Sequence, residues 1–373
     1  METSLAPNRR PSSGLYFLPP PISTRGGQGI ETLLMVCNAD WYFVAHWLPL
    51  ARQMRETARR IVVAAAEETG CRSVVEKEGV EFIPLNVQRR STNPLTEIAL
   101  GGRMFSLYRQ IKPTLVHHIT VKPVIYGSLA ARFAGVPAVV NSITGLGYLF
   151  LKPGYGGRIL NRMARSAYRL ALHGKHTCTL FQNADDRQLF LSTGLVEPQN
   201  SFAFPGVGID TDLFCPGSVA ADPPIVLLAA RMLRDKGVCE FVEAARTLQK
   251  QGVRCRMVLV GIPDKGNPAT LDEAQLRQWQ EEGTIEWWGY RDDMAAILQQ
   301  SSVAVLPSYR EGLPRFLQEA AGCGVPIVTT DVPGCRDVVT DGWNGFLVPP
   351  MDHRMLADRI GQLLTAEALR LQM

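Results

Sequence analysis

The sequence lacks carboxylates over an unusually long stretch, because no Asp or Glu occurs from Ile98 to Ala184 although 11 Lys and Arg do. The formal net charge of the whole chain is only +4. Residues 1–200 nevertheless hold 23 bases and 13 acids (23 − 13 = +10), whereas residues 201–373 hold 16 and 22 (16 − 22 = −6). A local excess of one sign bears on partners rather than on fold. We therefore expect the first half to lie near something anionic.

Other absences narrow the class of protein. No apolar run approaches the roughly 18 residues that a membrane-spanning helix needs. Residues 1–29 carry prolines and arginines instead of the continuous apolar segment of a secretory signal, and we expect a disordered extension there. The eight cysteines include no CxxC pair and the six histidines no HExxH motif. This spacing argues against a disulfide framework and a metal site, and we expect neither a metal nor another cofactor.

Short β-branched runs alternate with longer amphipathic stretches, the pattern of parallel sheets covered by helices on both faces. Since 373 residues are about twice the length of one domain, we predict two doubly wound α/β domains facing a cleft. They span residues 30–203 and 218–373, joined by a Gly/Pro-rich linker at 204–217. The predicted strands are Leu33–Cys37, Ile61–Ala65, Glu81–Leu85, Thr114–His118, Ala138–Asn141, Thr177–Phe181, Ile225–Ala229, Met257–Val260, Ile285–Trp288, Val303–Leu306, Ile327–Thr329 and Gly345–Val348. The predicted helices include Ala45–Arg59, Lys122–Ala134, Val238–Gln249, Asp292–Gln300 and Arg315–Cys323. Ligands are expected in the loops beyond the carboxyl ends of the strands.

Two glutamates flank a predicted strand-to-helix turn in the second half. Glu311 falls in the loop and Glu319 in the helix that follows. Gly312 permits close backbone approach, and the Leu313 amide would lie near the helix N-terminus, where an anion is favoured. Such carboxylates suit sugar and ribose hydroxyls. The alternative interpretation is a helix cap together with a solvated glutamate. If the two glutamates are considered without other segments, this alternative is preferred.

Arg231 and Lys236 lie five residues apart in the turn after another predicted strand. Arginine offers a fork for phosphate oxygens and lysine a point charge, so both side chains suit one diphosphate. Bases at the start of a helix oppose its dipole, which an anion nearby would explain. Ordinary surface charges in a turn are the alternative for this segment by itself.

Taken together, these segments resemble the family-4 retaining glycosyltransferases of GT-B architecture, which have two Rossmann-like domains. The E-x7-E signature of that family matches Glu311 to Glu319, and its R-x4-K-G element matches Arg231 to Gly237. The further matches are Val260-Gly261, Gly289, the tract Glu319–Gly334 and the segment Asp341–Pro349. The resemblance covers residues 31–373.

This resemblance implies a nucleotide-diphosphate sugar, UDP-linked, in the second domain and transfer with retention at the anomeric carbon. The donor-binding residues that it implies are Arg231, Lys236, Gly261, Gly312, Leu313 and Glu319. Arg231 and Lys236 would hold the diphosphate, and Glu319 would bind the ribose. Glu311 would act on the transferred sugar as a catalytic residue, without a metal.

Three loops of the first half, 38–51, 117–127 and 141–148, follow predicted strands. They resemble the bacterial branch of the family that extends undecaprenyl-diphosphate-linked saccharides, including the transferase that adds N-acetylgalactosamine to lipid-linked bacillosamine. The resemblance implies a polyprenyl-diphosphate-linked acceptor for this domain, in O-antigen, capsule or protein glycan assembly.

His117 and His118 are the candidates for polarising a substrate hydroxyl, and strand alternation sends one to the cleft and the other to the core. Hydrogen-bonded structural histidines are the alternative. Thr120 and Lys122 are candidates for an acceptor phosphate, with a solvated Lys122 as the alternative. His46 is a further acceptor candidate.

A helix predicted over Arg158–Ala171 gathers four arginines on one stripe at about 100° per residue. They are Arg158, Arg162, Arg165 and Arg169, and the opposite arc holds Ile159, Leu160, Met163, Ala164, Ala167, Leu170 and Ala171. An ordinary charged outer face would include acids, and this helix has none. We predict that the stripe faces anionic lipid headgroups or the acceptor diphosphate, which places the protein peripherally on the inner face of the bacterial cytoplasmic membrane.

Family members usually end with a helix that crosses back onto the first domain, and this sequence stops at Ala368–Met373, where that helix would begin. We therefore expect the closing helix to be absent. Two alternatives remain open, a nucleotide-sugar epimerase of the same fold and an inactive sugar-binding or scaffold protein. No interleaved aromatic platform indicates nucleic-acid binding.

Overall fold

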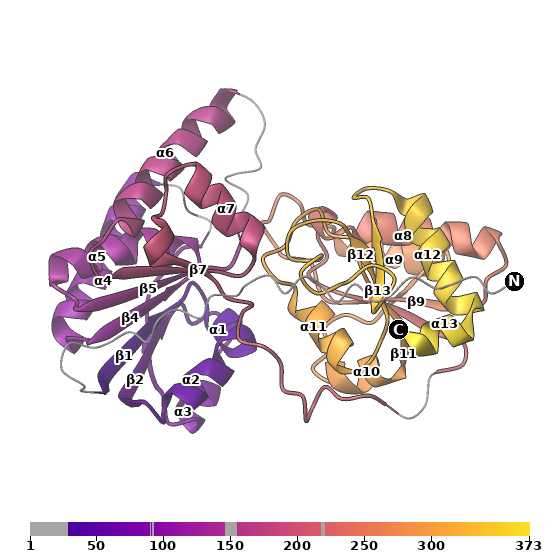
Figure 1. Cartoon of the computed structure of the whole chain (residues 1–373), viewed down its shortest axis with the longest axis horizontal. Helices are drawn as coiled ribbons and strands as arrows, with labels where there is room; N and C mark the ends of the chain where they lie inside the picture. The colour runs from indigo at the N-terminus through magenta and orange to yellow at the C-terminus, as the bar shows by residue number, and fades with distance from the viewer. Residues whose placement is uncertain (1–28, 90, 92, 146–154, 218–220) are drawn as a thin grey trace, which may run out of the picture. The chain divides into compact units, whose positions relative to one another are not determined.

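The computed structural model describes residues 29–89, 91, 93–145, 155–217 and 221–373 (Figure 1). The chain divides into two compact units between Val207 and Gly208, within the segment predicted as a linker. Residues 201–207 carry no charge, so the first unit keeps the net charge of +10 and the second keeps −6. The predicted disordered extension lies outside the described residues except for Gly29.

The first unit is built on a seven-stranded parallel sheet in the order β3-β2-β1-β4-β5-β6-β7 (Figure 1). Its strands are β1 (Ile30–Val36), β2 (Ala58–Ala65), β3 (Glu81–Pro84), β4 (Leu115–Ile119), β5 (Ala138–Ile143), β6 (Thr177–Phe181) and β7 (Ser201–Ala203). Its helices are α1 (Asp40–His46), α2 (Leu48–Met54), α3 (Arg72–Lys77), α4 (Pro94–Ile111), α5 (Ser128–Ala134), α6 (Tyr155–Leu172) and α7 (Ala184–Ser192), with the π-helix η1 (Pro123–Gly127) and the 3₁₀ turn η3 (Pro198–Asn200).

Alternate residues of the first sheet pack into separate hydrophobic cores. Leu33 and Met35 pack with α1, α2 and α3, whereas Leu34 and Val36 pack with α4 and α5. A third cluster joins η1, α6 and α7 to β5 and β6. Strands buried on both faces must be apolar throughout, which is why the sequence showed continuous β-branched runs.

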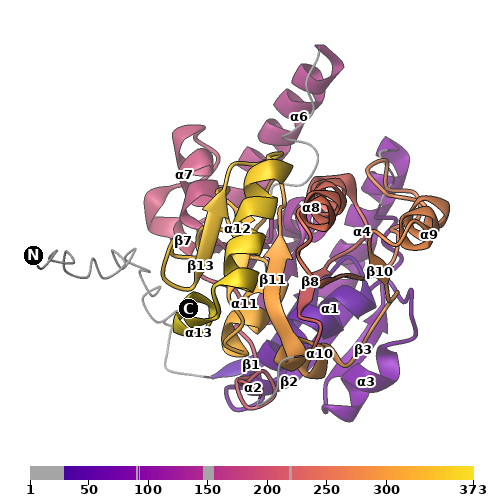
Figure 2. The same cartoon turned by 90° about the vertical axis from the view of Figure 1, so that its right-hand side faces the viewer.

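The second unit has a six-stranded parallel sheet in the order β10-β9-β8-β11-β12-β13 (Figure 2). Its strands are β8 (Ile225–Ala229), β9 (Arg256–Val260), β10 (Glu286–Trp287), β11 (Ser301–Leu306), β12 (Ile327–Thr330) and β13 (Gly345–Val348). Its helices are α8 (Val238–Lys250), α9 (Glu273–Glu281), α10 (Met294–Gln300), α11 (Arg315–Gly322), α12 (His353–Thr365) and α13 (Glu367–Gln372), with the 3₁₀ turn η4 (Arg234–Lys236).

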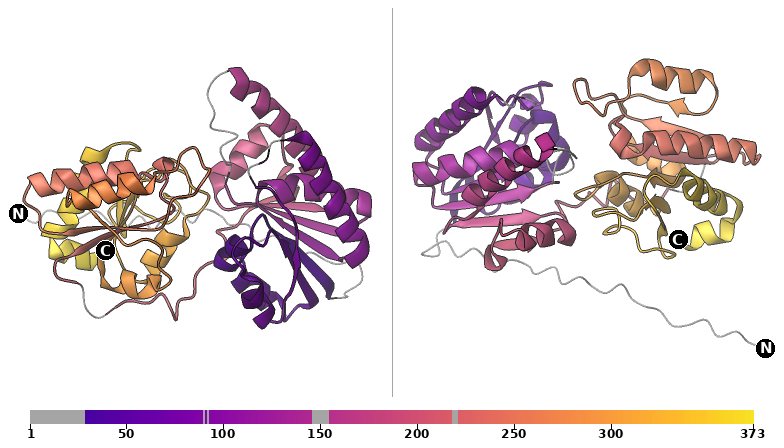
Figure 3. Two further views of the ribbon diagram at one scale, coloured as in Figure 1. Left: turned by 180° about the vertical axis from the view of Figure 1, so that it is seen from behind. Right: turned by 90° about the horizontal axis from the view of Figure 1, so that it is seen from above.

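Helices cover both faces of this second sheet as well (Figure 3). Side chains of α8, α9 and α12 fill one core, and those of α10 and α11 fill the other. The short α13 belongs to the same unit, because Leu369 and Met373 pack against the first of these cores. The predicted class of two doubly wound α/β units is thus confirmed.

Two helix predictions need correction. The predicted helix Ala45–Arg59 is wrong: α1 ends at His46, a new helix begins at Leu48 with Pro49 in its first turn, and the chain re-enters strand at Ala58. Proline suits the first turn of a helix because its missing N–H would be unpaired there anyway. The predicted helix Lys122–Ala134 begins instead as the π-helix η1. Strand β7 was not predicted, since three residues carry no period.

Each sheet has one point where the strand order reverses, between β1 and β4 in the first unit and between β8 and β11 in the second. Open α/β sheets bind ligands at such switch points, beyond the carboxyl ends of the strands. None of the helices within the described residues combines the length and apolar character needed to cross a bilayer.

Candidate functional site

Lys236 and Glu311 form an ion pair at the switch point of the second sheet. Lys236 ends η4 after β8, and Glu311 lies in the loop after β11. Lys236 Nζ lies 2.5 Å from Glu311 Oε1, and Ser308 Oγ donates to the same oxygen at 2.6 Å. The two charged side chains are only 19% and 11% exposed. The structure therefore brings the predicted phosphate-binding cation and the predicted catalytic carboxylate into direct contact.

The loops that carry this pair are in backbone contact. Gly237 has a φ of +73°, and a Cβ there would lie 2.1 Å from the Pro307 carbonyl oxygen. The Tyr309 amide donates to the Asp235 carbonyl at 2.9 Å. Only glycine fits so close an approach, which accounts for the Lys-Gly pair of the sequence motif.

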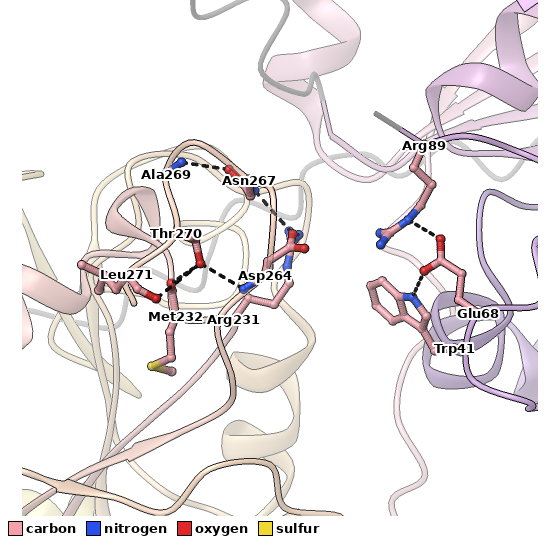
Figure 4. Close-up of polar contacts among 10 residues, drawn as sticks. All are labelled: Trp41, Glu68, Arg89, Arg231, Met232, Asp264, Asn267, Ala269, Thr270 and Leu271. Carbon is pink, nitrogen blue, oxygen red and sulfur yellow. Dashed lines mark hydrogen bonds and ion pairs between the residues drawn. The ribbon is translucent and has the colours of Figure 1, made fainter. Parts of the chain in front are cut away.

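Arg231, the other predicted phosphate ligand, has its own carboxylate (Figure 4). Its Nη1 donates to Asp264 Oδ2 at 2.7 Å, and the Arg231 side chain stays 47% exposed. Asp264 is fixed in the loop after β9, because its amide donates to Thr270 Oγ1 at 3.0 Å and its carboxylate accepts from Asn267 Nδ2 at 3.4 Å. The sequence analysis missed Asp264, whose one signal was its place after a strand that neighbours β8.

Gly261, predicted to bind the donor, has a clear packing role. Its φ is +134°, and a Cβ would lie 1.9 Å from the Ala230 carbonyl oxygen. Its amide donates to the Gly289 carbonyl at 2.7 Å, and its own carbonyl accepts from Trp287 Nε1 at 2.8 Å. This glycine lets the β9 loop pass against the chain just before Arg231. A donor contact at Gly261 stays a prediction.

Glu319 is the fifth residue of α11 and is mostly buried. Arg315, one turn earlier, donates from Nε to Glu319 Oε1 at 2.6 Å, and the Glu319 side chain is 11% exposed. Burial raises the pKa of Glu319 above its ordinary value, and Arg315 opposes that rise. Gly312 is buried and Leu313 half-buried just before this helix. Arg315 was not singled out in the sequence, although its spacing of four residues from Glu319 was a usable signal.

His117 and His118 take opposite faces of β4, and both are buried. His117 Nε2 lies 2.8 Å from Ser142 Oγ, and its ring meets Trp47 edge to face. His118 Nε2 lies 2.9 Å from the Tyr108 hydroxyl, and its Nδ1 lies 2.9 Å from Asn141 Oδ1. Burial lowers the pKa of His117 to about 3 and that of His118 to about 4. This arrangement is that of structural histidines, and their catalytic role stays a prediction.

The Lys122 side chain is mostly buried, and its ammonium group is engaged by protein oxygens. Its Nζ donates to the carbonyls of Gln88 at 2.6 Å and Ser91 at 2.8 Å, and it pairs with Glu97 Oε1 at 2.5 Å. All three ammonium hydrogens are thereby engaged, and the Lys122 side chain is 13% exposed. The predicted phosphate ligand instead anchors the loop after β3. The solvated alternative is wrong.

The two other acceptor candidates are Thr120, just after a strand, and His46, at the end of a helix. Thr120 follows β4 with a φ of +74°, and its hydroxyl is buried without a hydrogen-bond partner in the part of the chain that the structure describes. His46 ends α1, with its ring 4.5 Å from that of Tyr42. Of the predicted loop 141–148, residues 146–148 lie outside the described residues.

The N-terminal end of α6 projects from the body of its unit (Figures 1 and 2). Arg162 and Arg165, in the middle of α6, are exposed, and the side chain of Arg158 lies outside the described residues. Arg169 differs, because it donates to the carbonyls of Gly194 at 3.2 Å and Thr193 at 3.4 Å just after α7. It therefore caps a helix end instead of serving only the predicted stripe. On the opposite arc of α6, Ala164 and Ala171 are buried, whereas the Leu170 side chain is 61% exposed.

No group of three or more His, Cys, Asp or Glu side chains is arranged to hold a metal ion within the described ranges. Independence from metals and other cofactors stays a prediction. The polar groups at the switch point of the second sheet are carboxylates, cations and a hydroxyl, a set suited to phosphate and to sugar hydroxyls.

Comparison with known families matches each unit to a different family. Residues 32–183 match "Glycosyl transferase 4-like", and residues 223–366 match "Glycosyl transferases group 1". The second match contains Arg231, Lys236, Glu311 and Glu319.

Individual relatives extend over most of the chain. The N,N'-diacetylbacillosaminyl-diphospho-undecaprenol alpha-1,3-N-acetylgalactosaminyltransferase of Campylobacter jejuni is 26% identical over 87% of each chain. The UDP-Gal:alpha-D-GlcNAc-diphosphoundecaprenol alpha-1,3-galactosyltransferase of Escherichia coli is 24% identical over 66% of this chain and 65% of its own. Among solved structures, Anabaena HepE in complex with UDP and glucose is 16% identical over 91% of each chain, with a TM-score of 0.71.

Proposed function

This chain belongs to the group 1/4 glycosyltransferases of GT-B fold, and on that premise we propose that it moves a hexose or N-acetylhexosamine from a UDP-sugar to an undecaprenyl-diphosphate-linked saccharide, with retention. The observation that carries the proposal is the set of charged side chains at the switch point of the second sheet. Arg231 and Lys236 follow β8, Glu311 follows β11, and Glu319 lies in the next helix.

The second unit binds the donor. Breaking the bond between the anomeric carbon and the diphosphate leaves negative charge on phosphate oxygens, while a new bond forms to the acceptor hydroxyl oxygen and the hydroxyl proton is released. Arg231 and Lys236 stabilise the departing diphosphate without any metal. Asp264 and Glu311 hold the two cations in place before the donor arrives. Glu319 accepts the ribose hydroxyls through its carboxylate, and Glu311 acts on the transferred sugar.

The first unit receives the acceptor. Two relatives named above act, by their names, on saccharides linked to undecaprenyl diphosphate. The net charge of +10 on this unit, with no carboxylate from Ile98 to Ala184, suits a diphosphate-bearing lipid. Similarity over most of the chain and charge of the right sign support the same acceptor class.

We further propose that α6 holds the enzyme against the anionic inner face of the cytoplasmic membrane, where such a lipid lies. Arg162 and Arg165 of α6 are exposed, and the N-terminal end of this helix projects from its unit (Figure 1). A base near an anionic surface contributes about 1 kcal/mol, so a few of them give reversible association.

Incubation of the full chain with a panel of UDP-sugars and synthetic polyprenyl-diphosphate saccharides, followed by mass spectrometry of the lipid, tests the proposal. We expect one donor and acceptor pair to gain one sugar, and the Lys236→Ala and Glu319→Ala variants to lose this product. Interconversion of UDP-sugars without acceptor would favour an epimerase. Binding of UDP with no turnover of any kind would favour an inactive sugar-binding protein.

A further inference from the structure

Three side chains, one from the start of α1 and two from loops, meet at the carboxyl edge of the first sheet (Figure 4). Trp41 follows β1, Glu68 follows β2 and Arg89 follows β3. Glu68 accepts from Trp41 Nε1 at 3.1 Å and from Arg89 Nε at 2.9 Å. The Arg89 guanidinium lies 5.2 Å from the centre of the Trp41 ring. These residues form the Trp41–Glu68–Arg89 cluster, in which Glu68 is 33% and Arg89 25% exposed.

A buried carboxylate holds the loop that carries Glu68. Asp40 is fully buried at the start of α1 and accepts from the amides of Trp41 at 2.8 Å, Thr69 at 3.0 Å, and Glu68 and Cys71 at 3.2 Å. Burial by itself would raise the pKa of Asp40, but these four donors outweigh it and the pKa is lowered. One charged side chain thus fixes the positions of both Trp41 and Glu68.

A buried cation holds the loop that carries Arg89. Lys122 donates to the carbonyls of Gln88 and Ser91, which flank Arg89 on either side. Burying the Lys122 ammonium and its partner Glu97 costs desolvation free energy. This buried pair supports a loop at the edge of the sheet. Rigid support beneath a partly exposed polar group is what a binding site requires.

Unpaired polar atoms mark the same edge. Asn38 Oδ1, after β1, and Thr120 Oγ1, after β4, are buried and have no hydrogen-bond partner among the described residues. Val36 pairs with His118, and Asn38 and Thr120 each follow by two residues, so both lie just beyond the two strands that border the switch point. Thr120 also has a φ of +74°, a strained conformation for a β-branched residue. A ligand that carries hydroxyls would supply the missing partners.

We propose that the Trp41–Glu68–Arg89 cluster is a saccharide subsite that holds a sugar ring of the acceptor. Glu68 accepts hydrogen bonds from ring hydroxyls, Arg89 donates to sugar oxygens, and Trp41 supplies an apolar face for the ring carbons. Acceptor oxygens of Glu68 beside the donors of Arg89 match a neutral sugar ring, whose hydroxyl groups both donate and accept hydrogen bonds. The subsite rests on the proposed transferase function and specifies which part of the acceptor meets these residues.

The test compares acceptor and donor kinetics in three variants of the full chain, Trp41→Ala, Glu68→Gln and Arg89→Gln. With the polyprenyl-diphosphate saccharide that the wild type uses best, we expect the acceptor KM to rise about tenfold in each variant. Glu68→Gln and Arg89→Gln lose a charged hydrogen bond to the sugar, and Trp41→Ala loses the apolar surface against its ring. The donor KM and the affinity for UDP, measured by calorimetry, stay within about twofold. Glu81→Gln is the matched control, since Arg60 and Glu81 form a similar ion pair at 2.7 Å at the amino ends of β2 and β3.

An unchanged acceptor KM with a lowered melting temperature would mean that the cluster only supports its loops, and would overturn the subsite. An equal rise in the donor KM would overturn it too. If the wild type glycosylates no acceptor while it binds UDP, the transferase proposal fails by itself. The subsite is then tested by the binding of phosphate-free disaccharides, measured by ligand-observed NMR. Binding to the wild type that is absent in Glu68→Gln supports the subsite, and no binding to the wild type refutes it.

Discussion

Lys236 Nζ lies 2.5 Å from Glu311 Oε1, and this contact couples the stability of the second unit to its proposed chemistry. The Lys236→Met variant removes the cation that pairs with the mostly buried Glu311 carboxylate, so we expect the free energy of unfolding to fall by about 3 kcal/mol. It also removes a cation from the diphosphate site, and kcat/KM should fall about 100-fold. Urea denaturation and steady-state kinetics check both effects.

The double variant Lys236→Met with Glu311→Gln separates the two consequences. Neutralising Glu311 removes the buried carboxylate charge that has lost its cation, so we expect stability to return toward that of the wild type while activity stays low. Recovery of activity in the double variant would contradict the assignment of Lys236 to the donor phosphates.

The affinity for UDP should depend on pH through Glu319. Burial raises the pKa of Glu319, and its ionised form is the better acceptor for ribose hydroxyls, so affinity falls as the pH is lowered through that pKa. Arg315 opposes the rise, and Arg315→Met should therefore move the loss of affinity to higher pH. Calorimetric titration with UDP across the acid range measures the midpoint. Superposed curves for the wild type and Arg315→Met would refute the coupling, and Glu319→Gln should show no such midpoint.

The first unit should lose stability in acid because of its two buried histidines. The pKa values of His117 and His118 are lowered from 6.5 to about 3 and about 4. Between those values and 6.5 the unfolded chain binds protons that the folded chain does not, so the free energy of unfolding falls as the pH falls through this window. The slope is up to about 1.4 kcal/mol per pH unit for each histidine.

Urea denaturation at a series of pH values measures this slope. His118→Gln should make it shallower by about one proton, whereas the exposed His176, replaced by Gln, should leave it unchanged. An unaltered slope in His118→Gln would mean that His118 is not buried in its neutral form.

Gly261 should tolerate no side chain. Its φ is +134°, and a Cβ would lie 1.9 Å from the Ala230 carbonyl oxygen, so Gly261→Ala should lower the free energy of unfolding by about 3 kcal/mol or more. Gly252→Ala is the matched control, because Gly252 has a φ of +74° but a Cβ there would meet no atom within 4 Å, and a loss of about 1 kcal/mol is expected. Equal losses in thermal or urea unfolding would mean that only the backbone angle matters.

Charge reversal on α6 should release the protein from membranes. We expect Arg162→Glu with Arg165→Glu to abolish co-sedimentation with vesicles that contain phosphatidylglycerol, since each base contributes about 1 kcal/mol near such a surface. Arg169→Glu serves as the comparison, because Arg169 donates to the carbonyls of Thr193 and Gly194 and its loss should lower stability more than binding. Undiminished sedimentation of the double variant would exclude α6 as the contact.

The local hydrophobic pattern of the sequence was sufficient to predict the bounds of several buried strands. The bounds predicted for Thr177–Phe181, Ile225–Ala229 and Gly345–Val348 agree with β6, β8 and β13. Strand β7 depends on distant pairing and was missed, and the local break between α1 and α2 at Trp47 was also not predicted. Three residues of strand carry no period of their own, and their pairing with β6 defines them.

The sequence by itself determined the two-unit class, and it singled out Arg231, Lys236, Glu311 and Glu319, which the structure places after β8 and after β11. The tertiary structure decided how each charge is used. Lys122 and Arg169 are engaged by backbone carbonyls, and Lys236 is held by Glu311. The reason is physical: a charge removed from water must find a partner, and that partner comes from segments far away in the sequence, which spacing along the chain does not reveal.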